Sequence, residues 1–214
     1  MYKPSGQEVL NAIDQGIRNA QRDYLKSFQS DISSNYAPEY LMTVYIYQSL
    51  LGLIDGYSLA LEVPVGELFL TKLRGRKPWG AREGGRSDLV LWDSNDKPRV
   101  AIEVKKDAWN YYEDLIRLNR LLKRGLEFSV FASCWFEEVK DNNFKEAEDK
   151  LEEEIEFLRK YILDDNGKLG VNPSIELVHS NIDHLTIQGE RSEDNEELVW
   201  RPVIFKIYSK ENHE

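Results

Sequence analysis

The sequence predicts an α/β fold in which helices flank a mixed central sheet. Segments with helical periodicity alternate with short strand-like runs across residues 38–136, in the order helix, three strands, helix, strand. Two of those runs, residues 87–92 and 99–105, are joined by the turn-rich segment 93–98, which is typical of a hairpin. The chain has 214 residues, of which 41% are apolar and 31% charged, so we expect one globular domain with a sizeable core.

The six elements of this αβββαβ core follow one another without a long linker. Pro38 opens the first helix at a position where its missing N–H does no harm. The predicted helices span residues 38–53 and 107–124, and the predicted strands span residues 59–65, 87–92, 99–105 and 128–136. The second helix has an apolar stripe of leucines. Its bases, Arg117, Arg120, Lys123 and Arg124, lie on other sides, where they either add to the positive charge available for phosphates or only solvate the helix.

Further elements are expected on both sides of the core. Ser5 and Glu8 form a capping box that opens an N-terminal helix, which packs on the core or on a second subunit. A highly charged helix is predicted over residues 144–163, followed by strands near residues 175–179 and 199–208. We therefore divide the single domain 1–214 into a helical extension (1–35), the core (36–136), and an acidic helix with C-terminal strands (137–214).

The hairpin is the most informative feature of the chain. If its turn is centred between Asn95 and Asp96, antiparallel pairing sets Asp88 opposite Glu103, and the period of two places Lys105 on the same face. Two carboxylates and an ammonium group then converge. A hard divalent cation needs oxygen ligands held close together, and a nearby ammonium can orient or deprotonate a water, so the hairpin has the groups needed for metal-assisted hydrolysis.

The apolar residues of the hairpin support the same register. On the face opposite the charged residues lie Leu89, Leu91, Val100, Ile102 and Val104. A slip by one residue would bury the charges and expose these aliphatic side chains. Other apolar residues share the charged face, so we expect that face to be partly covered as well. The alternative interpretation of the charged residues is a solvated strand face with a cross-strand ion pair.

These residues resemble the PD-(D/E)xK nuclease superfamily, which has the restriction-endonuclease-like fold. The half-motif is Arg86-Ser87-Asp88, without the Pro of the name, and it is followed about fifteen residues later by Glu103-Val104-Lys105. The order of elements over residues 38–136 is similar to the common core of the superfamily. No Gln-x-x-x-Tyr element follows the lysine, so the exonuclease branch that carries this element is not indicated.

The resemblance implies a Mg²⁺-dependent nuclease that hydrolyses DNA phosphodiester bonds, with Mn²⁺ able to substitute. Asp88 and Glu103 would bind the metal, with the carbonyl of Val104 as a further ligand, and Lys105 would position or activate the attacking water. A glutamate on the first helix completes the metal shell in many members, and Glu39 stands at the matching place. Glu39 also suits the first turn of a helix for its interaction with the helix dipole, and Glu62 is the reserve candidate.

A cationic segment precedes the strand that carries Asp88. Six bases lie between residues 71 and 86 against one acid, whereas residues 137–165 hold twelve acids and five bases. This segment is predicted to hold nucleic-acid phosphates beside the metal, and the indole ring of Trp79 is available to stack on a base. The alternative is a soluble loop without a partner. The candidate nucleic-acid ligands are Lys72, Arg74, Arg76, Lys77, Trp79, Arg82 and Arg86.

Several classes of function are disfavoured by the composition. No apolar run reaches membrane-spanning length and no signal peptide is legible at the N-terminus, so we expect a cytoplasmic protein. Cys134 is interpreted as a core residue, and the three histidines lack the spacing of a zinc site. The sequence leaves open the specificity, the choice between DNA and RNA, and a homodimer. The alternatives are a catalytically inactive nuclease-fold protein that binds nucleic acid or assembles with partners, and a purely acidic interaction protein.

Overall fold

The computed structural model describes residues 4–27, 37–53, 58–64, 86–109, 111–168, 173–187 and 196–209. Within these residues the chain forms a seven-stranded sheet in the order β1-β2-β3-β4-β7-β5, and β6 also pairs with β7. Among the described strands β3 and β4 pair in parallel, and the remaining pairs are antiparallel. The strands are β1 (Ser58–Pro64), β2 (Arg86–Trp92), β3 (Pro98–Val104), β4 (Phe128–Glu138), β5 (Pro173–Leu177), β6 (Asp183–Ile187) and β7 (Glu196–Ser209).

The expected α/β class is confirmed, and the hairpin has the expected register. Leu89 pairs with Ile102 and Leu91 with Val100, so this part of the ladder is centred between Asn95 and Asp96, and the register shifts by one residue next to the turn, where Trp92 pairs with Pro98. One further step along this register sets Asp88 opposite Glu103. The Asp93 carboxylate closes the turn because it accepts hydrogen bonds from the backbone N–H groups of Asn95 (2.9 Å) and Lys97 (3.0 Å).

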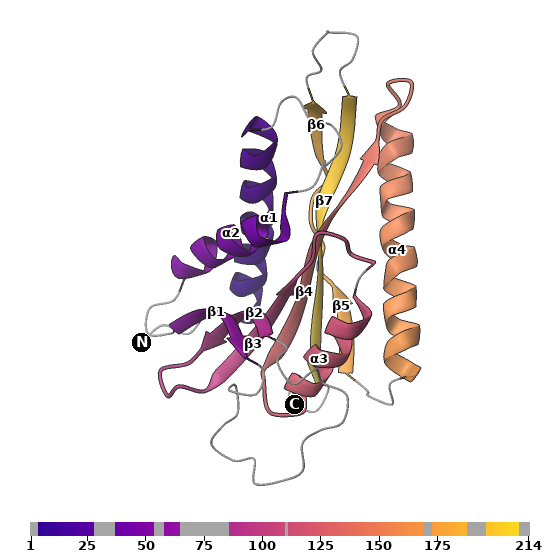
Figure 1. Cartoon of the computed structure of the whole chain (residues 1–214). Helices are drawn as coiled ribbons and strands as arrows, with labels where there is room; N and C mark the ends of the chain where they lie inside the picture. The colour runs from indigo at the N-terminus through magenta and orange to yellow at the C-terminus, as the bar shows by residue number, and fades with distance from the viewer. Residues whose placement is uncertain are drawn as a thin grey trace.

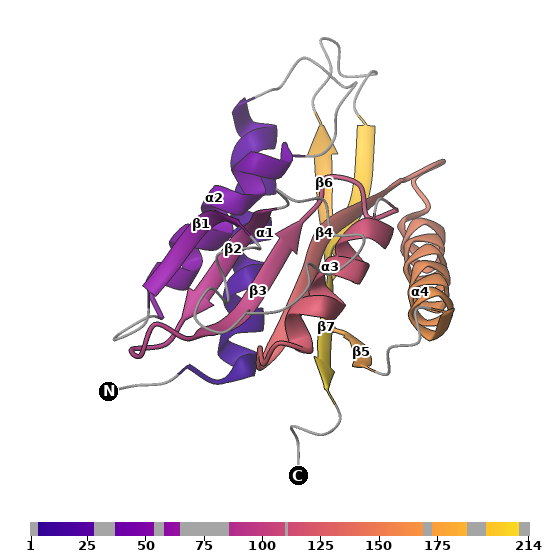
Figure 2. The ribbon, with the colours of Figure 1, turned by 60° about the horizontal axis from the view of Figure 1, so that its bottom comes forward.

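Helices cover both faces of the sheet (Figure 1). The first face packs against α1 (Gly6–Ser27) and α2 (Glu39–Leu51), in the core cluster that contains the aliphatic face of the hairpin. The second face packs against α3 (Tyr112–Leu122) and α4 (Phe144–Lys168). Val90 of β2 and Ala101 of β3 are the hairpin residues that belong to the core on this face. Figure 2 shows the two helical layers on opposite sides of the twisted sheet. The charged face of the hairpin is therefore covered by helices, as its apolar residues indicated.

The N-terminal helix begins at the predicted capping box. The Ser5 backbone N–H donates to Glu8 Oε2 (2.8 Å), and the Glu8 N–H donates to Ser5 Oγ (3.3 Å). Further along, α1 crosses α2 at Gly16, where an added Cβ would lie 2.6 Å from the Cα of Ile46. Only glycine allows this approach of the two backbones. The helix therefore packs on the core, which was one of the two expected positions.

Two local expectations were wrong, and one strand was missed. The helix predicted from residue 107 begins at Tyr112, because the Asp107 carboxylate accepts the Trp109 N–H (2.9 Å) and bends the chain into a turn first. Pro38 is the N-cap residue with ψ 145°, and so precedes the first helical position. The strand β6 was not predicted, although it pairs with the N-terminal half of β7. No helix among the described residues is long and apolar enough to cross a bilayer.

Candidate functional site

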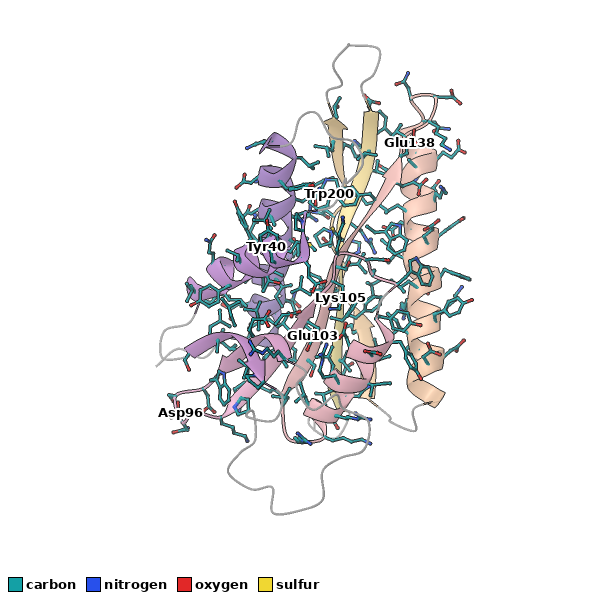
Figure 3. All side chains as sticks on the ribbon, viewed as in Figure 1. Tyr40, Asp96, Glu103, Lys105, Glu138 and Trp200 are labelled. Atoms are coloured by element: carbon teal, nitrogen blue, oxygen red, sulfur yellow. The ribbon has the colours of Figure 1, made fainter. Side chains whose placement is uncertain are left out.

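The candidate site lies at the end of β3, between α2 and α3, where Figure 3 labels Glu103 and Lys105. Residue parity directs Glu103 toward the α3 face together with Ala101. Its side chain is only 1% exposed, which is unusual for a carboxylate. Lys105 follows the last residue of β3, and its backbone N–H continues the parallel ladder by donating to the carbonyl of Ala132 (2.9 Å).

Asp88 on β2 is held against this strand end. The backbone N–H of Val104 donates to Asp88 Oδ2 at 2.7 Å. Burial raises the pKa of Asp88 to about 6 in spite of this bond and of nearby Lys105, and Glu39 and Glu62 add to the rise. The aspartate is therefore a carboxylate whose negative charge is poorly compensated by its surroundings.

Glu103 is the carboxylate of the cluster whose burial is least compensated by hydrogen bonds. Its Oε2 accepts a hydrogen bond from the guanidinium of Arg117 (3.0 Å), but its buried Oε1 has no hydrogen-bond partner. Burial raises the pKa of Glu103 well above its usual range, and the neighbouring Asp88 raises it further. A buried carboxylate oxygen without a partner is uncommon because it carries a large desolvation penalty. A cation placed at Oε1 would remove that penalty.

Lys105 lies between two carboxylates. Its Nζ is 3.4 Å from Glu39 Oε1 and 3.4 Å from Asp114 Oδ2. Burial lowers the pKa of Lys105, but the surrounding carboxylates, Asp114 foremost, outweigh this effect and raise the pKa above its usual value. The side chain is therefore an ammonium ion at neutral pH.

Two residues of α3 belong to the cluster and were missed by the sequence interpretation. The Asp114 side chain is 6% exposed and contacts both Lys105 and the guanidinium of Arg117. The interpretation of Arg117 as a solvating base was wrong, since it bridges Asp114 and Glu103. A signal was present in the sequence: Asp114 precedes Leu118 by four residues and so lies on the buried side of an amphipathic helix.

The remaining predicted metal ligands have different surroundings. Glu39, in the first turn of α2, contacts Lys105 and is 42% exposed. Glu62 stands across from Asp88 in the β1–β2 ladder, but the ladder skips it and its φ is 53°. This left-handed conformation costs a non-glycine residue about 1 kcal/mol or more. The role of the Val104 carbonyl stays a prediction, whereas the N–H of the same residue binds Asp88.

The described residues contain no group of three His, Cys, Asp or Glu side chains arranged to hold a metal ion. Such a group is not required for magnesium. Mg²⁺ usually keeps several waters and is bound through one or two carboxylates together with substrate phosphates. Asp88 and the unpartnered Oε1 of Glu103 supply the carboxylates of this kind of site. An all-protein cage of the type that binds Ca²⁺ does not fit.

Most of the predicted nucleic-acid ligands lie outside the described residues, namely Lys72, Arg74, Arg76, Lys77, Trp79 and Arg82. Arg86 is described, and it is an exposed side chain at the start of β2, two residues before Asp88. Next to the site, the turn after β3 and the strand β4 enclose a half-open pocket of about 410 Å³. Trp109 in this turn is 40% exposed and packs edge-on against Trp135 (5.7 Å between ring centroids).

Cys134 is the core residue that was expected, and one histidine makes structural contacts. Cys134 is fully buried in β4, and this burial raises the pKa of its thiol. The His184 ring lies 2.8 Å from Glu148 and stacks on Phe144. These residues take no part in the candidate site.

None of the family models, curated proteins or solved structures compared with the chain matches it. The chemistry of the site itself is therefore the basis for assigning a function. It offers two adjacent carboxylates with raised pKa values, an ammonium group held by two further carboxylates, and a guanidinium group.

Proposed function

We propose that this chain is a Mg²⁺-dependent nuclease that hydrolyses DNA phosphodiester bonds. The observation that carries the proposal is the buried Glu103 carboxylate, whose Oε1 has no partner, beside the Asp88 carboxylate. A folded protein gains nothing in stability from bringing two such groups together. Their proximity is understandable if a divalent cation binds between them.

The arrangement of the elements supports the proposal. The elements α2, β1, β2, β3, α3 and β4 follow one another in the αβββαβ order, with β1, β2 and β3 antiparallel and β4 parallel to β3. This arrangement resembles the restriction-endonuclease-like core of the PD-(D/E)xK superfamily. The proposal includes a cytoplasmic location, where DNA is within reach, and a homodimer as the form that would cut both strands of a duplex.

Each residue of the cluster has a role in this mechanism. Asp88 and Glu103 would hold the ion, with the Val104 carbonyl and Glu39 completing its shell. A bound divalent cation supplies a Lewis acid that favours formation of the nucleophile and stabilises charge on the leaving oxygen. Lys105 is held as an ammonium ion, so it orients the attacking water and offsets charge that develops on the phosphate. Its raised pKa disfavours a role as general base at neutral pH.

The test is a cleavage assay with supercoiled plasmid and single-stranded DNA, in Mg²⁺ or Mn²⁺ and in EDTA. Asp88→Asn and Lys105→Ala should each lower the rate by about 100-fold or more, the size expected for removing one electrostatic group from an active site. Asp93→Asn and Lys97→Ala are matched controls, because both residues belong to the β2–β3 turn and lie outside the cluster. Equal cleavage by all four variants would show that the activity does not arise at this site.

The same assay separates the main alternative, a catalytically inactive protein that binds nucleic acid or assembles with partners. One observation favours that alternative: Arg117 already compensates part of the Glu103 charge without an ion. A wild-type protein that retains DNA in a salt-sensitive manner but cleaves neither substrate in Mg²⁺ or Mn²⁺ would support the inactive module.

A further inference from the structure

Five charged side chains form a continuous chain across the site. In order they are Glu39, Lys105, Asp114, Arg117 and Glu103, and every neighbouring pair is in contact. Positive and negative groups alternate along the whole series. The guanidinium of Arg117 therefore shares its charge between Asp114 on its own helix and Glu103 on β3.

The last link of this chain is incompletely satisfied on both sides. Glu103 has the unpartnered acceptor Oε1, and Arg117 has a buried Nε–H that also lacks a partner. Arg117 thus offers Glu103 a single contact through one terminal nitrogen, where the fork of an arginine commonly makes two parallel hydrogen bonds to a carboxylate. The contact between Arg117 and Glu103 is a weak form of an interaction that is usually strong.

Asp114 is better placed to retain Arg117 than Glu103 is. It lies three residues earlier on α3, so one helical turn holds the two side chains together. The Arg117 side chain is 24% exposed as a whole, although its Nε–H is buried. A guanidinium next to a bound phosphate donates to two of its oxygens, which an ammonium cannot do in the same geometry.

We propose that Arg117 is a built-in counterion which a divalent cation displaces from Glu103, and that Asp114 then keeps the freed guanidinium beside the site as a ligand for the scissile phosphate. This inference rests on the proposed function. It assigns Arg117 two opposite effects, because the same side chain opposes cation binding and favours cleavage. A residue that only stabilises the fold has no reason to act in opposite directions.

The experiment measures cation affinity apart from activity. Mn²⁺ and Mg²⁺ are titrated by calorimetry, without DNA, into wild type, Arg117→Gln and Arg117→Lys. Removing a positive charge next to Glu103 should tighten Mn²⁺ binding by about ten-fold or more. Arg117→Lys keeps the charge and should bind Mn²⁺ as wild type does. Lys123→Gln is the matched control, because it removes one exposed positive charge from the C-terminal end of the same helix.

The second readout is cleavage at saturating cation concentration. Both Arg117 variants should cleave DNA at least ten-fold more slowly than wild type. The lysine variant should be slow because an ammonium group lacks the forked N–H donors of a guanidinium. If Arg117→Gln does not fold, the wild-type protein still tests the displacement. The NMR signal of the Arg117 Nε–H group should move as Mg²⁺, which is diamagnetic and replaces Mn²⁺ in this experiment, is added. A signal that stays in place through saturation would overturn the inference.

The failure of this inference differs from that of the proposed function. A wild-type protein that binds neither cation and cleaves nothing contradicts the nuclease proposal itself. A wild-type protein that binds cations and cleaves DNA, with an Arg117→Gln variant that binds Mn²⁺ no more tightly, contradicts the counterion role alone.

Discussion

Asp88→Asn is predicted to stabilise the metal-free protein. Burial raises the pKa of Asp88 from 3.8 to about 6, so in the pH range between these values the folded protein binds a proton that the unfolded chain does not. The stability contributed by this carboxyl group is fully present below pH 3.8 and is lost as the pH rises through about 6. Asparagine cannot ionise, and its side-chain oxygen can still accept the Val104 N–H, so the variant avoids that loss.

The magnitude follows from the shift. A difference of about two pH units, at about 1.4 kcal/mol each, gives up to about 3 kcal/mol in the free energy of unfolding above pH 7. For a chain of this size that corresponds to a rise in Tm of roughly 6–12 °C. Urea unfolding in EDTA at several values between pH 5 and pH 8 measures the effect, which should grow with pH up to about pH 7 and then level off. Mg²⁺ at 1,000 times its Kd should reverse the order, since an ion at that concentration stabilises wild type by about 4.1 kcal/mol.

Asp93→Asn is the matched control with the opposite sign. Burial raises the pKa of Asp93, but the backbone hydrogen bonds from Lys97 and Asn95, together with the charges of Arg99 and Lys97, outweigh it and lower the pKa below its usual value. Its ionised form therefore stabilises the fold, and the contribution is lost as the pH falls through the lowered pKa. At pH 8 Asp93→Asn should be less stable than wild type. If Asp88→Asn is also less stable at pH 8 in EDTA, Asp88 has a structural role and the reasoning is refuted.

Three further substitutions test other parts of the structure by urea unfolding. Gly16→Ala should lower the free energy of unfolding by about 1–3 kcal/mol, because its Cβ would meet the backbone of Ile46, and an unchanged stability would contradict this helix crossing. Arg201→Met should be neutral or stabilising, since the buried Arg201 has an unpartnered Nε and makes one ion pair (2.5 Å) with the half-exposed Glu152. A loss of more than about 3 kcal/mol in the free energy of unfolding would show that the ion pair is essential. Glu62→Gly should raise stability by up to about 1 kcal/mol by relieving the left-handed backbone, and a loss would mean that the Glu62 side chain makes a stabilising contact.

The sequence was informative where the alternation of apolar residues and the residue types of a turn determine the local structure. The alternation of Leu89, Leu91, Val100 and Ile102, with a turn that Asp93 closes, determined the hairpin register, and the structure has that register. The capping box was legible for the same reason, since its partners are three residues apart. Short strands without strong alternation carry no such signal, and β6 was missed because its pairing with β7 is a tertiary contact.

The candidate site was predictable in part. Asp88, Glu103 and Lys105 come from one hairpin and its end, so residue parity alone brought them together. The contacts of Asp114 and Arg117 depend on where α3 begins and how it lies over β3, which the sequence pattern misplaced by five residues. The burial of Asp114 could have been inferred from its position four residues before Leu118, but not its partners.

Lys105 is fixed at both ends, since its backbone N–H is bonded to Ala132 on β4 and its ammonium is held from α2 and α3. A lysine side chain that becomes ordered loses about 1.5–2 kcal/mol of rotational freedom. Here the loss occurs once, when the protein folds, so under the proposed function an incoming phosphate would meet a group that is already held in place. Warming should therefore weaken the hold on a substrate less than it would with a freely rotating lysine, as long as the native state persists.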